Sequence, residues 1–148
     1  MSENAATTEQ MAMMPKHGQV CWTEIATVNL DVCKTFYAEL FGWNLKRSEA
    51  VGAEMEYIEF GTGGDCPAGG MYQMGEEYGD APSHWMSYVA VDNVDETAEK
   101  VRKLGGNVCV PPTDIPNVGR FCVITDPTGA TFSMITLNSW NPVQLEIQ

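Results

Sequence analysis

The chain has 148 residues, and 44% of them are hydrophobic, which suffices for one compact domain or for two small halves around one core. Its net charge of −12 argues against nucleic acid and anionic membranes as partners, because both attract a positive protein surface. No stretch approaches the roughly 20 apolar residues of a membrane-spanning helix.

Residues 1–17 lack the basic start and the long apolar run of a signal peptide. We therefore expect them to form a flexible N-terminal tail. The five cysteines are odd in number and widely spaced, and none forms a CxxC pair, which excludes a zinc knuckle and a redox motif. Three of them lie in apolar runs, where a thiol behaves as a small hydrophobic group. We therefore expect buried free thiols and a cytoplasmic location.

Two segments align without gaps at an offset of 64 residues, namely EIATVNLDVCKTFYAELFG at 24–42 and YVAVDNVDETAEKVRKLGG at 88–106. Each predicts a strand that ends at Asn, an acid in the first helical turn, a helix and a closing glycine. Asn29 and Asn93 are predicted N-caps. Gly42 is a predicted left-handed residue after the first helix.

Apolar residues recur along both predicted helices. In the first, Val32, Phe36 and Leu40 lie at i, i+4 and i+8, which predicts a stripe buried against the outer face of a sheet. The second helix repeats this stripe with Val94, Ala98, Val101 and Leu104.

Three short strands are predicted after each helix, separated by runs rich in glycine and proline such as PPTDIPNVG. Their ranges are 43–49, 54–61 and 68–74 in the first half, and 107–110, 119–125 and 130–137 in the second. We expect a first module at 18–74, a linker at 75–83, a second module at 84–137 and a C-terminal tail at 138–148. Neither module can cover its sheet alone, so the two should combine around one concavity.

This duplicated pattern resembles the vicinal oxygen chelate superfamily, which includes glyoxalase I, bleomycin-resistance proteins, fosfomycin-resistance enzymes and extradiol dioxygenases. The local matches are FYAELFGW, VAVDNVDETAEKVRKLGGNV and DPTGATFSMI, in this order within residues 18–137. The resemblance implies an α+β fold in which two tandem βαβββ modules form a single domain with a cupped, barrel-like mixed sheet and helices on its outer face. It also implies a homodimer and, in metal-dependent members, a divalent ion in the cup.

In glyoxalase I-like members, metal ligands lie on the first and the last strand of each module. The resemblance places the first-strand ligands at Trp22 and Met86, seven residues before the capping Asn of each helix. The last-strand ligand of the second module, usually Glu, falls at Ser133, and that of the first falls within residues 69–71. Zinc, nickel and manganese require imidazole, thiolate or carboxylate groups. We therefore expect no metal and no other cofactor.

A metal at a displaced position would have to use His84, Glu24 or Glu59, with His17 just before the first strand. The two histidines are far apart and lack the H-x-H or H-x-x-x-H spacing of a metal site. We expect His84 to be a residue at the solvent edge of its strand.

Strand alternation predicts which residues line the cup. They are Trp22, Glu24, Ala26, Tyr72, Met86, Tyr88, Ala90, Thr131, Ser133 and Ile135. Aromatic, thioether and hydroxyl groups with one acid suit a flat or partly apolar small molecule. Alternatively, the same groups fill the space left by a lost metal. The sequence does not distinguish side chains that fill a core from side chains that line a ligand site.

Glu24 has two interpretations. A carboxylate inside an apolar cup has its pKa raised by desolvation, which suits a general base, and Tyr88 could then donate a hydrogen bond to a substrate oxygen. Alternatively, Glu24 is structural and accepts a hydrogen bond from a backbone amide or a neighbouring hydroxyl.

Two functions from different classes follow. The first is a metal-independent, bleomycin resistance-like protein that binds a small, partly apolar or aromatic molecule. Its binding residues would be Trp22, Glu24, Tyr72, Met86, Tyr88 and Ser133. The second is a glyoxalase-like lyase or isomerase with Glu24 as general base, with or without a metal at a non-standard position. The sequence leaves open whether the cup forms within one chain or across a dimer.

Overall fold

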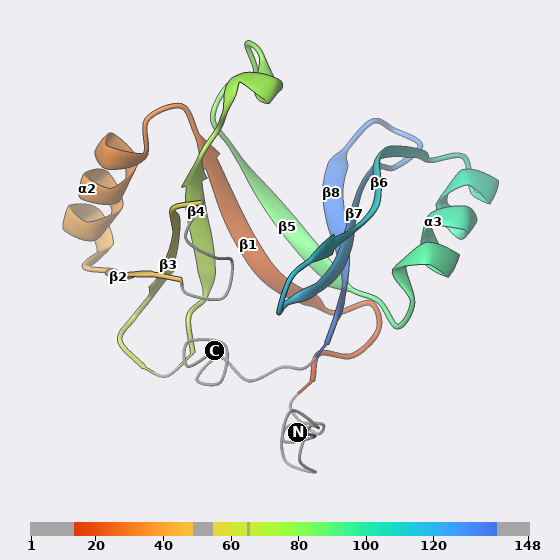
Figure 1. The fold of residues 1–148 in the computed structure, drawn as a ribbon, viewed down its shortest axis with the longest axis horizontal. Coiled ribbons are helices and arrows are strands. Elements are labelled where there is room, and N and C mark those ends of the chain that lie inside the picture. The colour runs from red at the N-terminus through yellow and green to blue at the C-terminus, as the bar shows by residue number, and fades with distance from the viewer. Residues whose placement is uncertain (1–13, 49–54, 65, 139–148) are drawn as a thin grey trace.

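The computed structural model describes residues 14–48, 55–64 and 66–138 (Figure 1). The first half contains β1 (Val20–Thr27), α2 (Leu30–Phe41), β2 (Asn44–Arg47), β3 (Tyr57–Gly61) and β4 (Gly69–Gln73). The second half contains β5 (His84–Ala90), α3 (Val94–Lys103), β6 (Asn107–Ile115), β7 (Gly119–Thr125) and β8 (Thr131–Leu137). A short 3-10 helix, η2 (Glu76–Tyr78), lies between them. The predicted order of strand, helix and three strands is confirmed in both halves.

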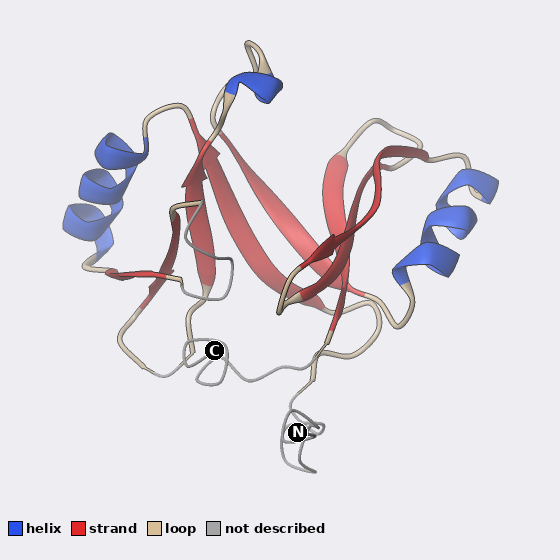
Figure 2. Ribbon diagram, in the orientation of Figure 1, coloured by secondary structure: helices blue, strands red, loops and turns tan. Residues whose placement is uncertain are grey.

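In this part of the chain, eight strands form one mixed sheet in the order β2-β3-β4-β1-β5-β8-β7-β6. The first strands of the two halves, β1 and β5, pair antiparallel at its centre, and each also pairs in parallel with the last strand of its own half. The sheet curves, with α2 and α3 on its outer side (Figures 1 and 2). The predicted cupped sheet is confirmed, and it stays open at β2 and β6 instead of closing into a barrel.

The predicted helix signals are present in the structure. The side-chain oxygen of Asn29 accepts from the backbone N–H of Val32 at 3.1 Å, and that of Asn93 accepts from Glu96 at 3.1 Å. Gly42 follows α2 with φ +71°, a left-handed conformation that only glycine adopts readily. Local capping therefore sets where each helix begins and where α2 ends.

The predicted buried stripe of α2 is wrong. Val32, Phe36 and Leu40 are 63%, 55% and 56% exposed. The buried residues of this helix are instead Leu30 and Cys33, whose core includes Ile25, Ile58, Phe60 and Met71, with Tyr37 packed at the edge. Apolar residues cover more than half of the circumference of α2, so two different apolar faces of this helix could pack on the sheet. Contacts with the sheet bury the face that carries Leu30, Cys33 and Tyr37, at i, i+3 and i+7.

The predicted stripe of α3 is mostly confirmed. Val94 and Ala98 are buried in a second core with Cys122, Ile124 and Met134, and Val101 packs against it. Leu104 is the exception, because it is 67% exposed at the end of the helix. The two helices thus cover separate cores on the outer face of the sheet.

Strand β6 is longer than the predicted 107–110 and runs through Pro111 and Pro112 to Ile115. Its register with β7 shifts on both sides of Val110. Because β6 lies at the edge of the sheet, the missing proline N–H groups interrupt no hydrogen bonding to a further strand. The prolines therefore mark an irregular edge strand instead of the predicted loop.

The cysteines are less buried than the sequence suggests. All five are free, and only Cys33 and Cys122 are buried, whereas Cys21 is intermediate and Cys66 and Cys109 are exposed. Within the described ranges, no helix is long and apolar enough to cross a membrane.

Candidate functional site

The six residues predicted to bind a ligand lie on four adjacent strands at the centre of the sheet. Across the β1–β5 pair, Trp22 lies opposite Tyr88 and Glu24 lies opposite Met86. Ser133 on β8 also lies opposite Tyr88. Directly paired residues point to the same face, so these five side chains share the inner face of the curve. The sixth is Tyr72, which pairs with Ala26 and therefore joins them from β4.

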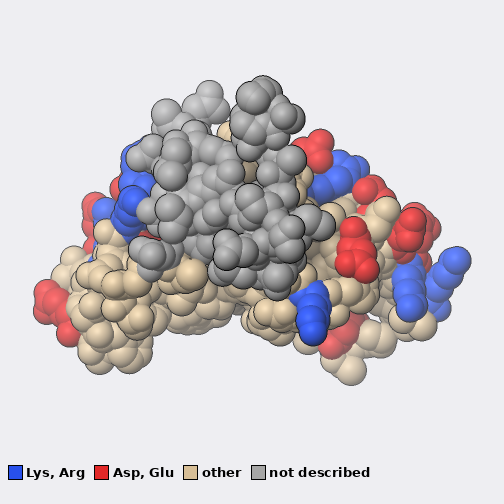
Figure 3. Space-filling view, turned by 90° about the horizontal axis from the view of Figure 1, so that it is seen from below, with Lys and Arg blue, Asp and Glu red and all other residues tan. Residues whose placement is uncertain are grey.

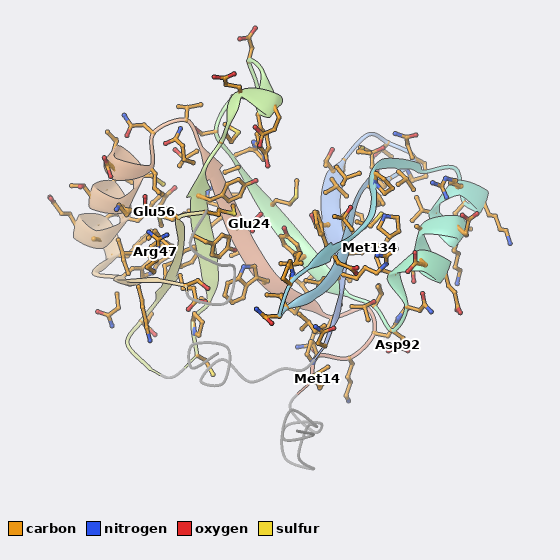
Figure 4. All side chains as sticks on the ribbon, viewed as in Figure 1. Met14, Glu24, Arg47, Glu56, Asp92 and Met134 are labelled. Carbon is orange, nitrogen blue, oxygen red and sulfur yellow. The ribbon has the colours of Figure 1, made fainter. Side chains whose placement is uncertain are left out.

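Glu24 lies at the centre of a hydrogen-bond network on this face. The Tyr57 hydroxyl donates to Oε1 of Glu24 at 2.8 Å, and the Tyr88 hydroxyl donates to Oε2 at 3.0 Å. The indole N–H of Trp22 donates to the Tyr57 hydroxyl at 2.8 Å. Both carboxylate oxygens thus have a tyrosine donor, and we call Trp22, Glu24, Tyr57 and Tyr88 the glutamate network. In Figure 4, Glu24 lies on β1 near the middle of the sheet.

Tyr57 is the network residue that the sequence prediction missed. It belongs to β3 and pairs with Tyr72, which places its side chain on the inner face. The sequence does show that Tyr57 and Glu59 point to the same side of their strand. It does not show whether that side is the inner or the outer face of the sheet, because this depends on the register with the neighbouring strand.

Gly70 explains how the Tyr57 ring reaches Glu24. This glycine lies opposite Glu24 on one side and opposite Glu59 on the other, on the inner face of β4. A Cβ atom at this position would clash with the ring and hydroxyl of Tyr57. The absence of a side chain at residue 70 therefore opens the space across which Tyr57 contacts β1.

Burial raises the pKa of Glu24 above its ordinary value of 4.5, because the carboxylate is removed from water. The hydrogen bonds from Tyr57 and Tyr88 act in the opposite direction, but their effect is smaller. The same burial, together with the negative charge of Glu24, raises the pKa of Tyr57 and Tyr88. The network is thus a carboxyl group with a raised pKa that accepts hydrogen bonds from two protonated tyrosine hydroxyls.

A second tyrosine pair lies beside the network. The Tyr72 and Tyr78 hydroxyls are 2.8 Å apart, and the Tyr72 ring stacks on Tyr57 with centroids 6.2 Å apart. Tyr78 belongs to η2 within the predicted linker, which the sequence prediction did not connect with the site. Burial also raises the pKa of Tyr72. Four of the five tyrosines therefore lie in one connected group.

We predict that Tyr57, Tyr72 and Tyr88 stay protonated above pH 10 while the protein is folded. Their raised pKa values mean that the unfolded chain, in which tyrosine ionises near pH 10, loses these protons first. Stability should therefore fall as the pH rises through about 10. Phenolate absorbance from these three residues should appear together with the loss of circular dichroism. Titration of all five tyrosines in the folded protein would contradict the prediction.

The positions that hold metal in the resembled family carry residues unsuited to a divalent ion. Trp22 offers only an N–H donor, and its indole already bonds Tyr57. Ser133 is fully buried, and its hydroxyl donates to the sulfur of Met86 at 2.8 Å. The fourth position is Gly70, because Gly69 and Met71 lie on the opposite face from Glu24. These donors do not fit zinc, nickel or manganese.

The displaced metal site finds no support among the described residues, where no three His, Cys, Asp or Glu side chains are grouped to hold an ion. The Nδ1 atom of His84 lies 2.8 Å from the Pro82 carbonyl, and His17 accepts from the backbone of Asp92. His84 thus bonds a residue two positions away at the start of its strand, whereas His17 bonds a residue 75 positions away in the second half.

The sequence profile of the Glyoxalase/Bleomycin resistance protein/Dioxygenase superfamily matches residues 19–134, which span both halves of the sheet. The chain belongs to this superfamily. Among curated superfamily relatives, CFP32 of Mycobacterium tuberculosis, a candidate glyoxylase, is 38% identical over 80% of this chain and 44% of its own. The anthracycline biosynthesis protein DnrV of Streptomyces peucetius is 29% identical over 79% of this chain and 46% of its own. The matched part of this chain therefore covers less than half the length of these relatives.

Solved structures of this superfamily share the fold. Methylmalonyl-CoA epimerase from Mycobacterium tuberculosis superposes with a TM-score of 0.57 at 16% identity, covering 86% of this chain and 95% of the epimerase. The Mn(II)-bound glyoxalase from Novosphingobium aromaticivorans gives a TM-score of 0.56 at 18% identity, over 85% of this chain and 41% of its own. At these identities the likeness concerns the fold alone.

Proposed function

We propose that this superfamily member binds a small, partly apolar or aromatic molecule on the inner face of the sheet, without a divalent metal ion. The observation that carries the proposal is the glutamate network, which lies where metal-dependent relatives are expected to hold an ion. In it two tyrosine hydroxyls donate to Glu24, and the indole N–H of Trp22 donates to one of these tyrosines, Tyr57. Hydroxyls, thioethers and aromatic rings recognise ligands by stacking and hydrogen bonding.

Three predicted lining residues are suited to contact a ligand directly. Trp22, Tyr72 and Met86 are partly exposed, whereas Glu24, Tyr88 and Ser133 are buried. A ligand would stack on the exposed rings and the thioether, and the buried groups would hold these side chains in place. This division follows the usual composition of ligand sites, which combine apolar walls with few polar groups.

The second candidate function is a lyase or isomerase in which Glu24 acts as general base. The raised pKa of Glu24 favours it, because a base of higher pKa accepts a proton more readily. The two tyrosine hydrogen bonds leave lone pairs on both carboxylate oxygens, so a substrate proton could still be accepted.

The experiment begins with a thermal-shift screen of small molecules, followed by titration of each hit with tryptophan fluorescence as the readout. Trp22→Ala should weaken binding of a hit by about tenfold, since a lost aromatic contact costs on the order of 1 kcal/mol beyond its area. Trp85→Ala is the matched control, because Trp85 lies on the outer face of β5 and should leave the affinity unchanged. Equal effects of the two variants would show that the ligand binds elsewhere.

Glu24→Gln separates the two functions. In a binding protein it should change the affinity by about 1–3 kcal/mol. In an enzyme it should abolish turnover of the confirmed ligand and leave its binding largely intact. Elemental analysis of the purified protein should find far less than one Zn, Ni, Mn or Fe per chain. A stoichiometric ion whose removal lowers stability would contradict the metal-independent proposal.

A further inference from the structure

The buried carboxyl group of Glu24 has only neutral hydrogen-bond partners. In the part of the chain that the structure describes, its oxygens bond the hydroxyls of Tyr57 and Tyr88, and no lysine or arginine pairs with it. Burial raises the pKa of Glu24, and His84, which acts through space, offsets this rise less than either tyrosine hydrogen bond does. A buried carboxylate without a cation is costly, so a positive group brought next to it would be stabilised.

The directions of the hydrogen bonds in the glutamate network suit the ionised form of Glu24. The indole N–H of Trp22 can only donate, and it donates to the Tyr57 hydroxyl, which in turn donates to Glu24. The Tyr88 hydroxyl donates to the other carboxylate oxygen. An ionised carboxylate accepts at both oxygens, whereas a protonated carboxyl has to donate from one of them. No group of the network supplies a positive charge, so the countercharge has to come from outside it.

Partly exposed aromatic rings lie beside this carboxyl group. Trp22 belongs to the network, the Tyr72 ring stacks on Tyr57, and the Tyr78 hydroxyl lies 2.8 Å from that of Tyr72. Trp22, Tyr72 and Tyr78 are all of intermediate exposure. The π faces of Trp and Tyr attract cations within about 6 Å of the ring centre, and several such rings together recognise ammonium groups.

The negative charge of Glu24 acts on these rings as well. Burial, the hydrogen bond with Tyr78 and the charge of Glu24 raise the pKa of Tyr72. Burial and the charge of Glu24 do the same for Tyr88. A negative potential that disfavours a phenolate at these hydroxyls favours a cation in the same place, and inside a protein this potential is screened less than in water.

The inner face of the second half is uncharged and partly apolar. Strand pairing places Val123 opposite Ser133, Val110 opposite Val123 and Phe121 opposite Ile135, all on the same face as Tyr88. The side chains of Val110, Phe121 and Val123 are exposed or partly exposed. This part of the inner face therefore suits the apolar portion of a ligand.

The charges of the second half lie on its outer side. Asp114 and Arg120 are the only charged residues of β6, β7 and β8, and they lie opposite each other on the outer face, where Arg120 also bonds Asp95 of α3. Seen from below, acidic and basic side chains gather at the α3 end of the molecule (Figure 3). The inner face is thus acidic and aromatic in the first half and neutral in the second.

We propose that the molecule bound on the inner face carries an ammonium group, quaternary or protonated, attached to an apolar or aromatic body. The inference rests on the proposed function and adds the charge of its ligand. The ammonium group would lie against the rings of Trp22 and Tyr72 within reach of the charge of Glu24, and the body would extend over Phe121 and Val123. A neutral molecule of the same shape would leave Glu24 without a countercharge, and an anion would be repelled.

Isothermal titration calorimetry with three probes of similar shape tests the charge. The cation is the para-hydroxyphenyl trimethylammonium ion, its neutral counterpart is para-tert-butylphenol, in which carbon replaces nitrogen, and the anion is para-phenolsulfonate. The cation should bind at least about tenfold more tightly than para-tert-butylphenol, and the anion should bind most weakly.

Two pairs of variants identify the groups responsible. Glu24→Gln removes the charge but keeps the shape of the side chain, and it should reduce the preference for the cation to within about twofold. Glu99→Gln is the matched control, because it removes an equal charge at an exposed position of α3 and should leave the preference unchanged. Tyr72→Leu should weaken binding of the cation by about fivefold, whereas Tyr72→Phe, which keeps the ring, should retain it. Circular dichroism checks that all four variants are folded.

A preference for the cation that Glu24→Gln removes and Glu99→Gln keeps would support the ammonium ligand. Equal or tighter binding of the neutral or anionic probe, a preference that survives Glu24→Gln, or no binding of any probe would overturn it. The proposed function is judged by the hits of the thermal-shift screen and their sensitivity to Trp22→Ala. A neutral hit that binds on the inner face would therefore refute the ammonium group and leave the proposed function standing.

Discussion

Glu24→Ala should lower the free energy of unfolding by about 2–4 kcal/mol at pH 5. The substitution removes the shared acceptor of two buried hydroxyls, those of Tyr57 and Tyr88. A buried donor left without an acceptor costs about 1–3 kcal/mol. Urea unfolding followed by circular dichroism measures the loss directly.

Glu24→Gln is the matched control, since it keeps the shape of the side chain and one carbonyl oxygen. That oxygen can still accept from Tyr57, and the amide can donate to the Tyr88 hydroxyl, which has free lone pairs. We expect a loss below about 1 kcal/mol. If Ala and Gln cost the same, the hydrogen bonds of the network do not stabilise the fold, and the structural interpretation of Glu24 fails.

The pH dependence of the same variants tests the raised pKa of Glu24. The folded protein holds this proton more tightly than the unfolded chain, whose pKa lies near the ordinary value of 4.5. The stability that the protonated carboxyl contributes is therefore present at acid pH and is lost as the pH rises from 4.5 towards the raised value. Glu24→Gln lacks this proton, so its stability relative to the wild type should improve over the same interval.

Gly70→Ala should cost about 2–4 kcal/mol in stability and also disrupt the glutamate network. The added methyl group would occupy the position of the Tyr57 ring, and overpacking of this kind costs about 1–3 kcal/mol. Displacement of the ring would further break the hydrogen bonds to Trp22 and Glu24. Near-ultraviolet circular dichroism, which reports the packing of aromatic rings, should change together with the unfolding midpoint.

Gly64→Ala is the matched control, because a Cβ atom at that loop position meets no atom within 4 Å. A double-mutant cycle identifies the cause of the loss. In a Tyr57→Ala background, where the ring is absent, Gly70→Ala should cost little. An unchanged cost in that background would show that the clash involves something other than Tyr57.

Features that depend on local sequence were predictable. The capping Asn29 and Asn93 and the closing Gly42 mark helix ends through contacts within a few residues, and each acts as predicted. The repeat at an offset of 64 residues predicted two equivalent halves, which is what the sheet contains. Strand alternation likewise predicted that Trp22 and Glu24 share a face, since side chains alternate whatever the strand pairs with.

Features that depend on which distant segments pair or pack together were not predictable from the sequence. The sequence of α2 offers two apolar stripes, and only packing against Ile25 and Phe60 buries Leu30 and Cys33 and leaves Phe36 exposed. The period of a helix identifies its possible faces but not the one that meets the sheet.

The contact between Tyr57 and Glu24 likewise depends on which distant segments pair. It joins residues 33 positions apart, and it requires the registers of β3 with β4 and of β4 with β1 to bring Tyr57, Gly70 and Glu24 together. A shift of one residue in either pair would turn the ring to the other face of the sheet. The sequence by itself therefore determined the modules, the helix ends and the alternation within each strand. Only the tertiary structure decided which helix face is buried and how the network forms, because register and packing depend on contacts between distant segments.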